Sequence, residues 1–253
     1  MYNCFEHIEL VSFYIFTGGV AKYVEIFVEK KAFTFYKQLN LIFDDFSLFL
    51  EEGKNLLIEE FGKEYTTYFS ILSLIASSKT SRTEIESVLG RNIGGYLEKL
   101  EKDYTLIRKI KPIFAKEGSR ILKYEIIDNY FNFWFRFIYK YKSAIEIENY
   151  EFVKEIVKRD FNVYSGKFLE KYFIEKLKLI NDYSNIGTYW EKANQNEIDI
   201  VAINDLDKKA LIAEVKINPK KIDLEILKQK AKKLEKELNT YECEYLGFSL
   251  NDM

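Results

Sequence analysis

Apolar residues recur with helical periodicity along the first quarter of the chain. In the stretch FYKQLNLIFDDFSLFL they stand at Phe35, Leu39, Ile42, Phe43, Phe46, Phe49 and Leu50. This spacing places them on one face of a helix. The pair Gly18-Gly19 is the only sharp break, and it predicts a turn between helices. We therefore predict that residues 1–62 form a helical segment.

Three short helices and a hairpin are predicted over residues 63–142. The stretch YTTYFSILSLIASS is apolar at helical spacing, and IGGYLEKLEK predicts the third helix. Between them, Thr80 or Ser81 is placed to cap a helix, and Glu84 completes a capping box if Ser81 is the cap. RKIKPIF and RILKYEIID then read as two strands joined through AKEGS. Helix, helix, helix and hairpin is the order of elements in a winged-helix domain.

An aromatic stretch, IIDNYFNFWFRFIYKYK, closes this part of the chain at residues 126–142. It is too rich in Phe and Tyr to stand alone in water, so we predict a buried helix that links the winged helix to the C-terminal part of the chain. The alternative use of these rings is to stack on nucleic-acid bases.

Residues 143–253 alternate between helical and strand patterns. A helical connector is predicted over residues 147–160, followed by the amphipathic helix SGKFLEKYFIEKLKLI. Two strand-like runs, EIDIVAIN and ALIAEVKI, precede the lysine-rich helix LEILKQKAKKLEKEL and a last apolar run, YLGFSL. The order α-β-β-α-β predicts a mixed sheet with helices packed against it. The predicted fold class is therefore α+β with several domains.

Two carboxylates lie inside strands that should be dry. Asp199 stands between two isoleucines, and Glu214 stands between an alanine and a valine, two residues before Lys216. If the strands pair through the turn DLDKKA, the two acids meet at one end of the sheet. Paired carboxylates repel each other in a low dielectric, and Mg²⁺, which prefers hard oxygen ligands, would neutralise them. The alternative is a half-exposed hairpin with these charges on its solvated face.

Several motifs follow one another along the chain: GGVAKYVE, RKIKPIF, YEIIDNYFNFWFRF, GKFLEKYF, IGTYWEK, and EIDIVAI with ALIAEVK. In these motifs nearly the whole chain resembles the C-terminal region of a family of archaeal and bacterial AAA-type ATPases. The last domain of that family has no known function and is assigned to the PD-(D/E)XK nuclease-like superfamily. The resemblance implies a remnant of the ATPase lid region at residues 1–62. It also implies an α/β restriction-endonuclease-like domain with a mixed sheet at residues 143–253.

The resemblance assigns roles to the residues of the acidic site. Asp199, Glu214 and Lys216 match the D…(E)xK core of the superfamily, and Glu170 matches the acid of its first helix. In this interpretation the three acids hold Mg²⁺ or Mn²⁺, and Lys216 positions or activates the nucleophile that hydrolyses a phosphodiester bond of DNA. The alternative is a non-catalytic DNA-binding or protein-interaction module. Such a module would be the C-terminal part of a split or truncated ATPase, with an ATPase domain or subunit in trans as its partner.

The chain departs from the family pattern in three respects. Ala21 stands where the glycine-rich segment usually has proline, and Tyr189-Trp190 replaces a pair of tryptophans. The phosphate-binding pattern GxxxxGK[ST] does not occur, so nothing in this sequence would cradle the phosphates of a nucleotide. We therefore expect no ATPase activity from this chain.

The formal net charge of -2 provides no global attraction to nucleic acid, so any such binding would use local patches. Residues 208–237 hold 10 lysines against 5 acids, which suits either a phosphate backbone or a solvated helix face. The helix predicted at IGGYLEKLEK could enter a DNA groove, or its domain could bind protein instead. The basic residues that we propose for DNA contact are Arg91, Lys99, Lys102, Lys192, Lys220 and Lys221.

Cysteine usage and hydropathy indicate the compartment in which we expect the protein. Cys4 and Cys243 lie near opposite ends of the chain and predict neither a disulfide framework nor a zinc site. No apolar run approaches the length needed to cross a bilayer. We therefore predict a cytoplasmic protein without a membrane partner.

Overall fold

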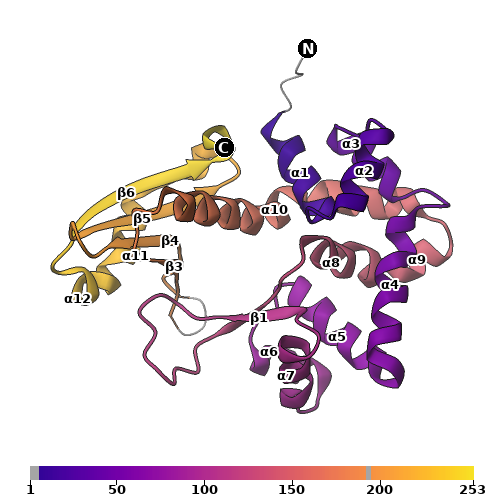
Figure 1. The fold of residues 1–253 in the computed structure, drawn as a ribbon, viewed down its shortest axis with the longest axis horizontal. Helices are drawn as coiled ribbons and strands as arrows, with labels where there is room; N and C mark the ends of the chain where they lie inside the picture. Colours follow the sequence, from indigo (N-terminus) through magenta and orange to yellow (C-terminus); the bar gives the residue numbers. More distant parts are fainter. Residues whose placement is uncertain (1–5, 192–194) are drawn as a thin grey trace. The chain divides into compact units, whose positions relative to one another are not determined.

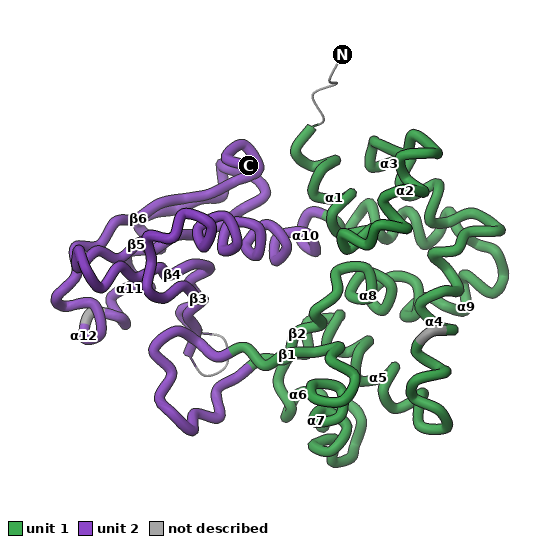
Figure 2. The backbone as a smooth tube through the Cα atoms, viewed as in Figure 1, with its two compact units in different colours: residues 1–110, 123–161 green, residues 111–122, 162–253 purple. Residues whose placement is uncertain are grey.

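The computed structural model describes residues 6–191 and 195–253. They form two compact units (Figure 1, Figure 2). Unit 1 contains the residues up to 110 together with residues 123–161, and unit 2 contains residues 111–122 and 162–253. The predicted α+β class, with a helical N-terminal region and a C-terminal mixed sheet, is confirmed.

The N-terminal part of unit 1 is helical, as its periodicity predicts. Its helices are α1 (His7–Thr17), α2 (Ala21–Glu29), α3 (Phe35–Ile42) and α4 (Leu48–Phe61). α1 ends at Gly18, whose φ of 59° lies in the left-handed region that glycine adopts without strain. The N–H of Gly18 donates to the carbonyl oxygen of Tyr14, and the predicted glycine turn then leads into α2.

Three helices and a hairpin follow in the predicted order. After a 3₁₀ turn (Gly62–Glu64), they are α5 (Tyr65–Ala76), α6 (Arg82–Leu89), α7 (Gly94–Lys102), β1 (Ile107–Ile110) and β2 (Lys123–Ile126), the strands pairing antiparallel. Ser81 caps α6, because its hydroxyl accepts a bond from the Glu84 N–H at 3.3 Å. The Glu84 carboxylate in turn accepts from the Ser81 N–H at 2.9 Å. The capping box therefore uses Ser81 and not Thr80.

The aromatic stretch is not the single regular helix that we predicted. It forms α8 (Asn129–Phe133), a π-helical turn (Trp134–Ile138), a 3₁₀ turn (Tyr139–Tyr141) and α9 (Lys142–Glu146). Most of its rings are buried in unit 1, namely those of Tyr130, Phe133, Trp134, Phe135 and Phe137. The Tyr130 hydroxyl donates to the carbonyl oxygen of Phe49 at 2.8 Å, and the Trp134 indole N–H donates to that of Leu50 at 3.0 Å. These two buried rings, with their polar tips satisfied, have no free faces for stacking on bases.

One long helix, α10 (Tyr150–Ile180), leads the chain from unit 1 into unit 2. We predicted a connector and a separate amphipathic helix here. They join because no proline interrupts the stretch, and its single glycine, Gly166, costs only about 1 kcal/mol inside a helix. Among the described helices, this one included, none is long and apolar enough to cross a membrane. The predicted domain boundaries after residues 62 and 142 stay predictions.

Unit 2 is built on a four-stranded sheet. In spatial order its strands are β3 (Asn185–Tyr189), β4 (Ile198–Asn204), β5 (Lys209–Lys216) and β6 (Glu242–Ser249). β3, β4 and β5 pair antiparallel, and β6 pairs parallel to β5, so the sheet is mixed. We did not predict β3, because its sequence NIGTY is short and contains Gly187, and glycine weakens a strand pattern.

Helices pack on both faces of this sheet. α11 (Leu224–Ala231), a 3₁₀ turn (Lys232–Leu234) and α12 (Glu235–Leu238) follow β5. Leu227 of α11 packs with Val201 and Ile212 on one face. On the other face Phe173 of α10 stacks on Phe248, with ring centroids 4.6 Å apart. The sheet is therefore dry on both sides near its centre, which explains the nearly continuous apolar run of β5.

The loop between β1 and β2, residues 111–122, belongs to unit 2 although both strands belong to unit 1. Its Ile113 is only 6% exposed and joins the apolar core beside the sheet. The N–H of Ile113 donates to the carbonyl oxygen of Thr188 at 2.8 Å. The register of β3 shifts between Gly187 and Tyr189, at this point of contact. The loop thus covers part of the edge strand that would otherwise present unpaired backbone groups.

Candidate functional site

Lys216, the last residue of β5, lies between the two predicted carboxylates. Its Nζ is 3.2 Å from Oδ2 of Asp199 and 3.1 Å from Oε1 of Glu214. The same amine donates to the carbonyl oxygen of Val215 at 3.2 Å. Three oxygen atoms from the chain therefore surround one cation position.

The register of β4 and β5 brings these groups together. Ile200 is paired with Ala213, so Asp199 and Glu214, one position further along, are neighbours across the two strands. Because side chains alternate along a strand, both acids point toward the face covered by α11. The Asp199 carboxylate also accepts a bond from the Val215 N–H at 2.8 Å, which holds it against the end of β5.

Glu214 is the most buried of the three charged groups. Its side chain is 8% exposed, compared with 13% for Asp199 and 33% for Lys216. Its Oε1 is also 3.6 Å from the Nζ of Lys230, and its Oε2 accepts from the Asp223 N–H at 3.2 Å. Both oxygens are therefore satisfied, which removes most of the cost of burying this charge.

Charge pairing decides the protonation of Lys216. Burial by itself lowers the pKa of this amine, but the carboxylates of Asp199 and Glu214 outweigh burial, and the pKa is raised above the ordinary value for lysine. Lys216 is therefore a cation at neutral pH. In that state it can donate hydrogen bonds to a water or to a phosphate oxygen, but it cannot accept a proton.

Lys230 and Asp223 belong to this site, and sequence reasoning missed both. Asp223 caps α11, its carboxylate accepting from two N–H groups of the first turn, and its own N–H points to Glu214. Lys230 lies three residues after the buried Leu227 and next to the buried Ala231. A lysine beside the apolar stripe of an amphipathic helix was the signal that could have identified it.

Gly247 leaves the space that the segment after β5 occupies. It is paired with Glu214 on the neighbouring strand, and a Cβ at this position would overlap the side chain of Ile222, the residue just before Asp223. We expect Gly247→Ala to lower the free energy of unfolding by about 2 kcal/mol, since an overpacked side chain must move with its backbone. Urea denaturation measures this loss.

The control for this prediction is Gly166→Ala in α10, where an added Cβ meets no atom within 4 Å. That change should raise the free energy of unfolding by up to about 1 kcal/mol, because alanine is the better helix former. Equal stability of the two variants would contradict the close approach of Gly247 and Ile222.

Glu170 comes from the helix on the other side of the sheet. It lies in α10, three residues before Phe173, and is partly buried. The described contacts of the Lys216 amine are with Asp199, Glu214 and Val215. Within residues 6–191 and 195–253, no group of three or more His, Cys, Asp or Glu side chains is placed to hold a metal ion. The acids that share a cation position are therefore the pair on β4 and β5.

The basic residues predicted to contact DNA fall in different places. Arg91 donates to the Thr67 hydroxyl and lies over the Tyr96 ring, 5.3 Å from its centroid. Lys102 pairs with Glu98 at 2.7 Å. Lys99 is exposed on α7. Two of the three residues predicted for DNA contact near α7 are therefore engaged in local contacts.

The remaining three candidates lie in the C-terminal part of the chain. Lys220 and Lys221 are exposed in a 3₁₀ turn (Pro219–Lys221) that follows β5 by two residues. They therefore stand a few positions beyond Lys216 in the chain. Lys192 lies outside the described residues.

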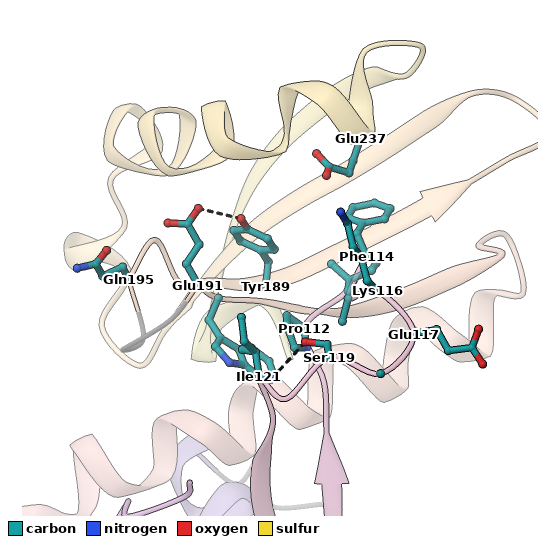
Figure 3. A pocket seen from close by; sticks show the side chains of 14 residues that line it. Pro112, Phe114, Lys116, Glu117, Ser119, Ile121, Tyr189, Glu191, Gln195 and Glu237 are labelled. Atoms are coloured by element: carbon teal, nitrogen blue, oxygen red, sulfur yellow. Dashed lines mark hydrogen bonds between the residues drawn. The ribbon is translucent and has the colours of Figure 1, made fainter. Parts of the chain in front are cut away.

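A separate pocket of about 700 Å³ lies between the 111–122 loop and the end of β3 (Figure 3). Its walls include Phe114, Tyr189 and Trp190, and Asp199, Glu214 and Lys216 do not line it. The Tyr189 hydroxyl donates to a carboxylate oxygen of Glu191 at 3.3 Å. Burial, together with that carboxylate, raises the pKa of Tyr189 to about 12. The pocket is thus distinct from the carboxylate site.

Part of the chain that includes this site matches a known family model. Residues 134–234 match DUF234. That family is described as "Archaea bacterial proteins of unknown function". The DUF234 match extends from the π-helical turn to the end of the 3₁₀ turn after α11, and it contains the acids on β4 and β5 and both lysines of the site.

Two curated proteins also align with the chain. An uncharacterized protein of Methanocaldococcus jannaschii is 34% identical over 218 residues, which are 82% of this chain and 48% of that protein. The sulfotransferase 1E1 of Mus musculus is 22% identical over 197 residues, which are 74% of this chain and 65% of that protein. This chain thus spans about half the length of its archaeal relative. No solved structure matches it significantly.

Proposed function

We propose that this chain is a metal-dependent nuclease that hydrolyses phosphodiester bonds of DNA at the Asp199–Glu214–Lys216 site. The observation that carries the proposal is the convergence of three oxygen atoms on the amine of Lys216, at 3.1 to 3.2 Å. Two of them belong to side chains that are largely buried, and strands do not usually place acids there without a cation to share.

The donor set suits Mg²⁺ or Mn²⁺. Carboxylate and carbonyl oxygens are the hard ligands that these ions take, and the partial exposure of Lys216 indicates that the site opens to solvent. Asp199 and Glu214 would hold the ion, with the Val215 carbonyl beside them, and the third ligand expected from the sequence, Glu170, stays a prediction. When bound, the ion supplies Lewis acidity to the phosphate and lowers the pKa of a bound water.

Lys216 has a role of its own in this proposal. With Asp199 and Glu214 holding an ion, the amine of Lys216 would be free to donate to the attacking water or to the scissile phosphate. Without an ion, pairing with the two carboxylates raises the pKa of Lys216 and keeps the amine protonated.

The remaining parts of the chain would bring DNA or a partner to this site. We propose that residues 63–142 are a winged helix and that the chain corresponds to the C-terminal region of an AAA-type ATPase, in agreement with the order of elements and with the DUF234 match. The loop that would be the wing contributes Ile113 to the core of unit 2. DNA contact by this domain would therefore depend on α7, with Arg91, Lys99 and Lys102.

A non-catalytic interaction module is the second candidate. It is favoured by the local engagement of Arg91 and Lys102 and by the fact that Lys216 already pairs with both acids. In that case the acidic site is structural, and an ATPase domain or subunit in trans is the partner.

Incubation of the chain with supercoiled and linear DNA, with and without Mg²⁺ or Mn²⁺, tests the proposal. We expect Asp199→Asn to reduce cleavage by about 10²-fold or more, because it removes charge from the cation position. Asp207→Asn, on the exposed turn after β4, is the matched control and should cleave like the wild type. Equal cleavage by both variants would exclude this site. Absence of cleavage by the wild-type chain would favour the interaction module.

A further inference from the structure

One carboxylate oxygen of Glu214 forms ion pairs with two lysine amines. Oε1 is 3.1 Å from the Nζ of Lys216 and 3.6 Å from the Nζ of Lys230. Both lysine side chains keep contact with solvent, at 33% and 30% exposure, while the carboxylate between them is 8% exposed. Lys230 is delivered by α11, whose first turn is held by the cap residue Asp223. Glu214 thus holds the amines of Lys216 and Lys230 where the site opens to solvent.

We propose that Lys230 is a second phosphate-binding residue, which Glu214 holds until a divalent cation binds and then releases to a phosphate of the nucleic-acid backbone. This inference rests on the proposed function, because it takes a phosphodiester as the ligand and Asp199 and Glu214 as the cation site. A divalent cation at Oε1 of Glu214 would repel both ammonium groups. Lysine has a flexible four-carbon stem, so the Lys230 amine can turn toward solvent while α11 stays in place.

The two amines differ in what else holds them. Lys216 also contacts Asp199 and the Val215 carbonyl, whereas the ion pair described for Lys230 is with Glu214 alone. Lys230 is therefore the more easily released of the two. Replacing Lys230 leaves both acids paired with Lys216, so a variant at position 230 should fold. Lys230 is a positioning residue for the phosphate, and Lys216 stays next to the reacting bond.

The test compares Lys230→Met with Lys228→Met. Lys228 lies two residues earlier on α11, is 48% exposed and pairs with Glu225 at 2.8 Å, so each variant removes one positive charge from the same helix. Calorimetric titration of the full chain with Mg²⁺, without DNA, should show about fivefold tighter binding by Lys230→Met than by the wild type. Lys228→Met should bind Mg²⁺ like the wild type. Unchanged or weaker Mg²⁺ binding by Lys230→Met would overturn the proposal.

The second measurement is the salt dependence of binding to a labelled duplex DNA, by rapid mixing before cleavage proceeds. With Mg²⁺ present, the slope of log K against log salt should be smaller by about 1 for Lys230→Met than for Lys228→Met, as expected for one lost phosphate contact. Without Mg²⁺ the two slopes should agree, and Lys230→Arg should restore the wild-type slope. Equal slopes with Mg²⁺ would overturn the inference.

The outcomes separate this inference from the nuclease proposal. Wild-type cleavage of DNA together with identical behaviour of the two lysine variants would remove the role of Lys230 and leave the nuclease. A tighter Mg²⁺ site and a smaller salt slope in Lys230→Met, without cleavage by the wild type, would support the exchange at Glu214 and exclude the nuclease.

Discussion

Lys216→Met is expected to reduce Mg²⁺-dependent DNA cleavage by about 10²- to 10³-fold, the usual effect of removing one group that stabilises developing charge. It should also make the stability of the protein depend on divalent cations. The variant leaves the carboxylates of Asp199 and Glu214 side by side without the amine that contacts both. Without divalent cations we expect the free energy of unfolding to fall by about 2 kcal/mol. The loss is no larger because the N–H groups of Asp223 and Val215 still donate to Glu214 and Asp199.

Mg²⁺ should restore this loss. At about 100 times its dissociation constant, a cation that binds only the folded state adds about 2.7 kcal/mol. Thermal unfolding with and without Mg²⁺ should therefore show a larger upward shift for Lys216→Met than for the wild type, in which the amine competes with the ion. A variant that cleaves DNA like the wild type would contradict the catalytic role, and one that Mg²⁺ does not stabilise would contradict the shared cation position.

Ile113→Asp is expected to lower the free energy of unfolding of unit 2 by about 4 kcal/mol. Ile113 is 6% exposed in the apolar core beside the sheet, so the substitution removes buried methylenes and places a charge among Val201, Ile203 and Ile212. The destabilisation should extend to β3, because the Thr188 carbonyl of that strand accepts the N–H of Ile113. Hydrogen exchange at this amide and chemical denaturation measure the two effects.

Ile121→Asp, in the same loop, is the matched control. Ile121 is 40% exposed, so its replacement should change the free energy of unfolding by no more than about 0.5 kcal/mol. If both variants unfold at the same denaturant concentration, the loop is not part of the folded core of unit 2.

Local patterns predicted those elements whose signals lie within a few residues. The capping box at Ser81 and Glu84 formed as expected, since both partners lie in one turn of helix. The apolar runs that became β4, β5 and β6 were predicted, because each strand is seven or eight residues long and mostly apolar at its centre. β3 was missed, since a short strand with Gly187 acquires its structure from the pairing with β4 and from the 111–122 loop.

The residues of the candidate site also divide into those that local patterns predicted and those that they did not. Alternation along two strands predicted that the side chains of Asp199 and Glu214 would share a face, and that Lys216 would lie with them. The amine of Lys230 and the N–H of Asp223 could not be assigned, because their contact with Glu214 depends on how α11 crosses the sheet. Residues 208–237 contain 10 lysines, and the sequence alone does not show that Lys230 is the one on α11 that faces Glu214.

The amino-acid sequence alone determined the helical N-terminal region, the mixed sheet in the C-terminal part, and the placing of the acids and the amine where β4 begins and β5 ends. These features follow from periodicity and from neighbours in the chain. The tertiary structure alone decided that the 111–122 loop belongs to unit 2 and that α11 adds a second lysine to Glu214. Those contacts join residues far apart in the chain, and packing, which sequence periodicity does not encode, brings them together.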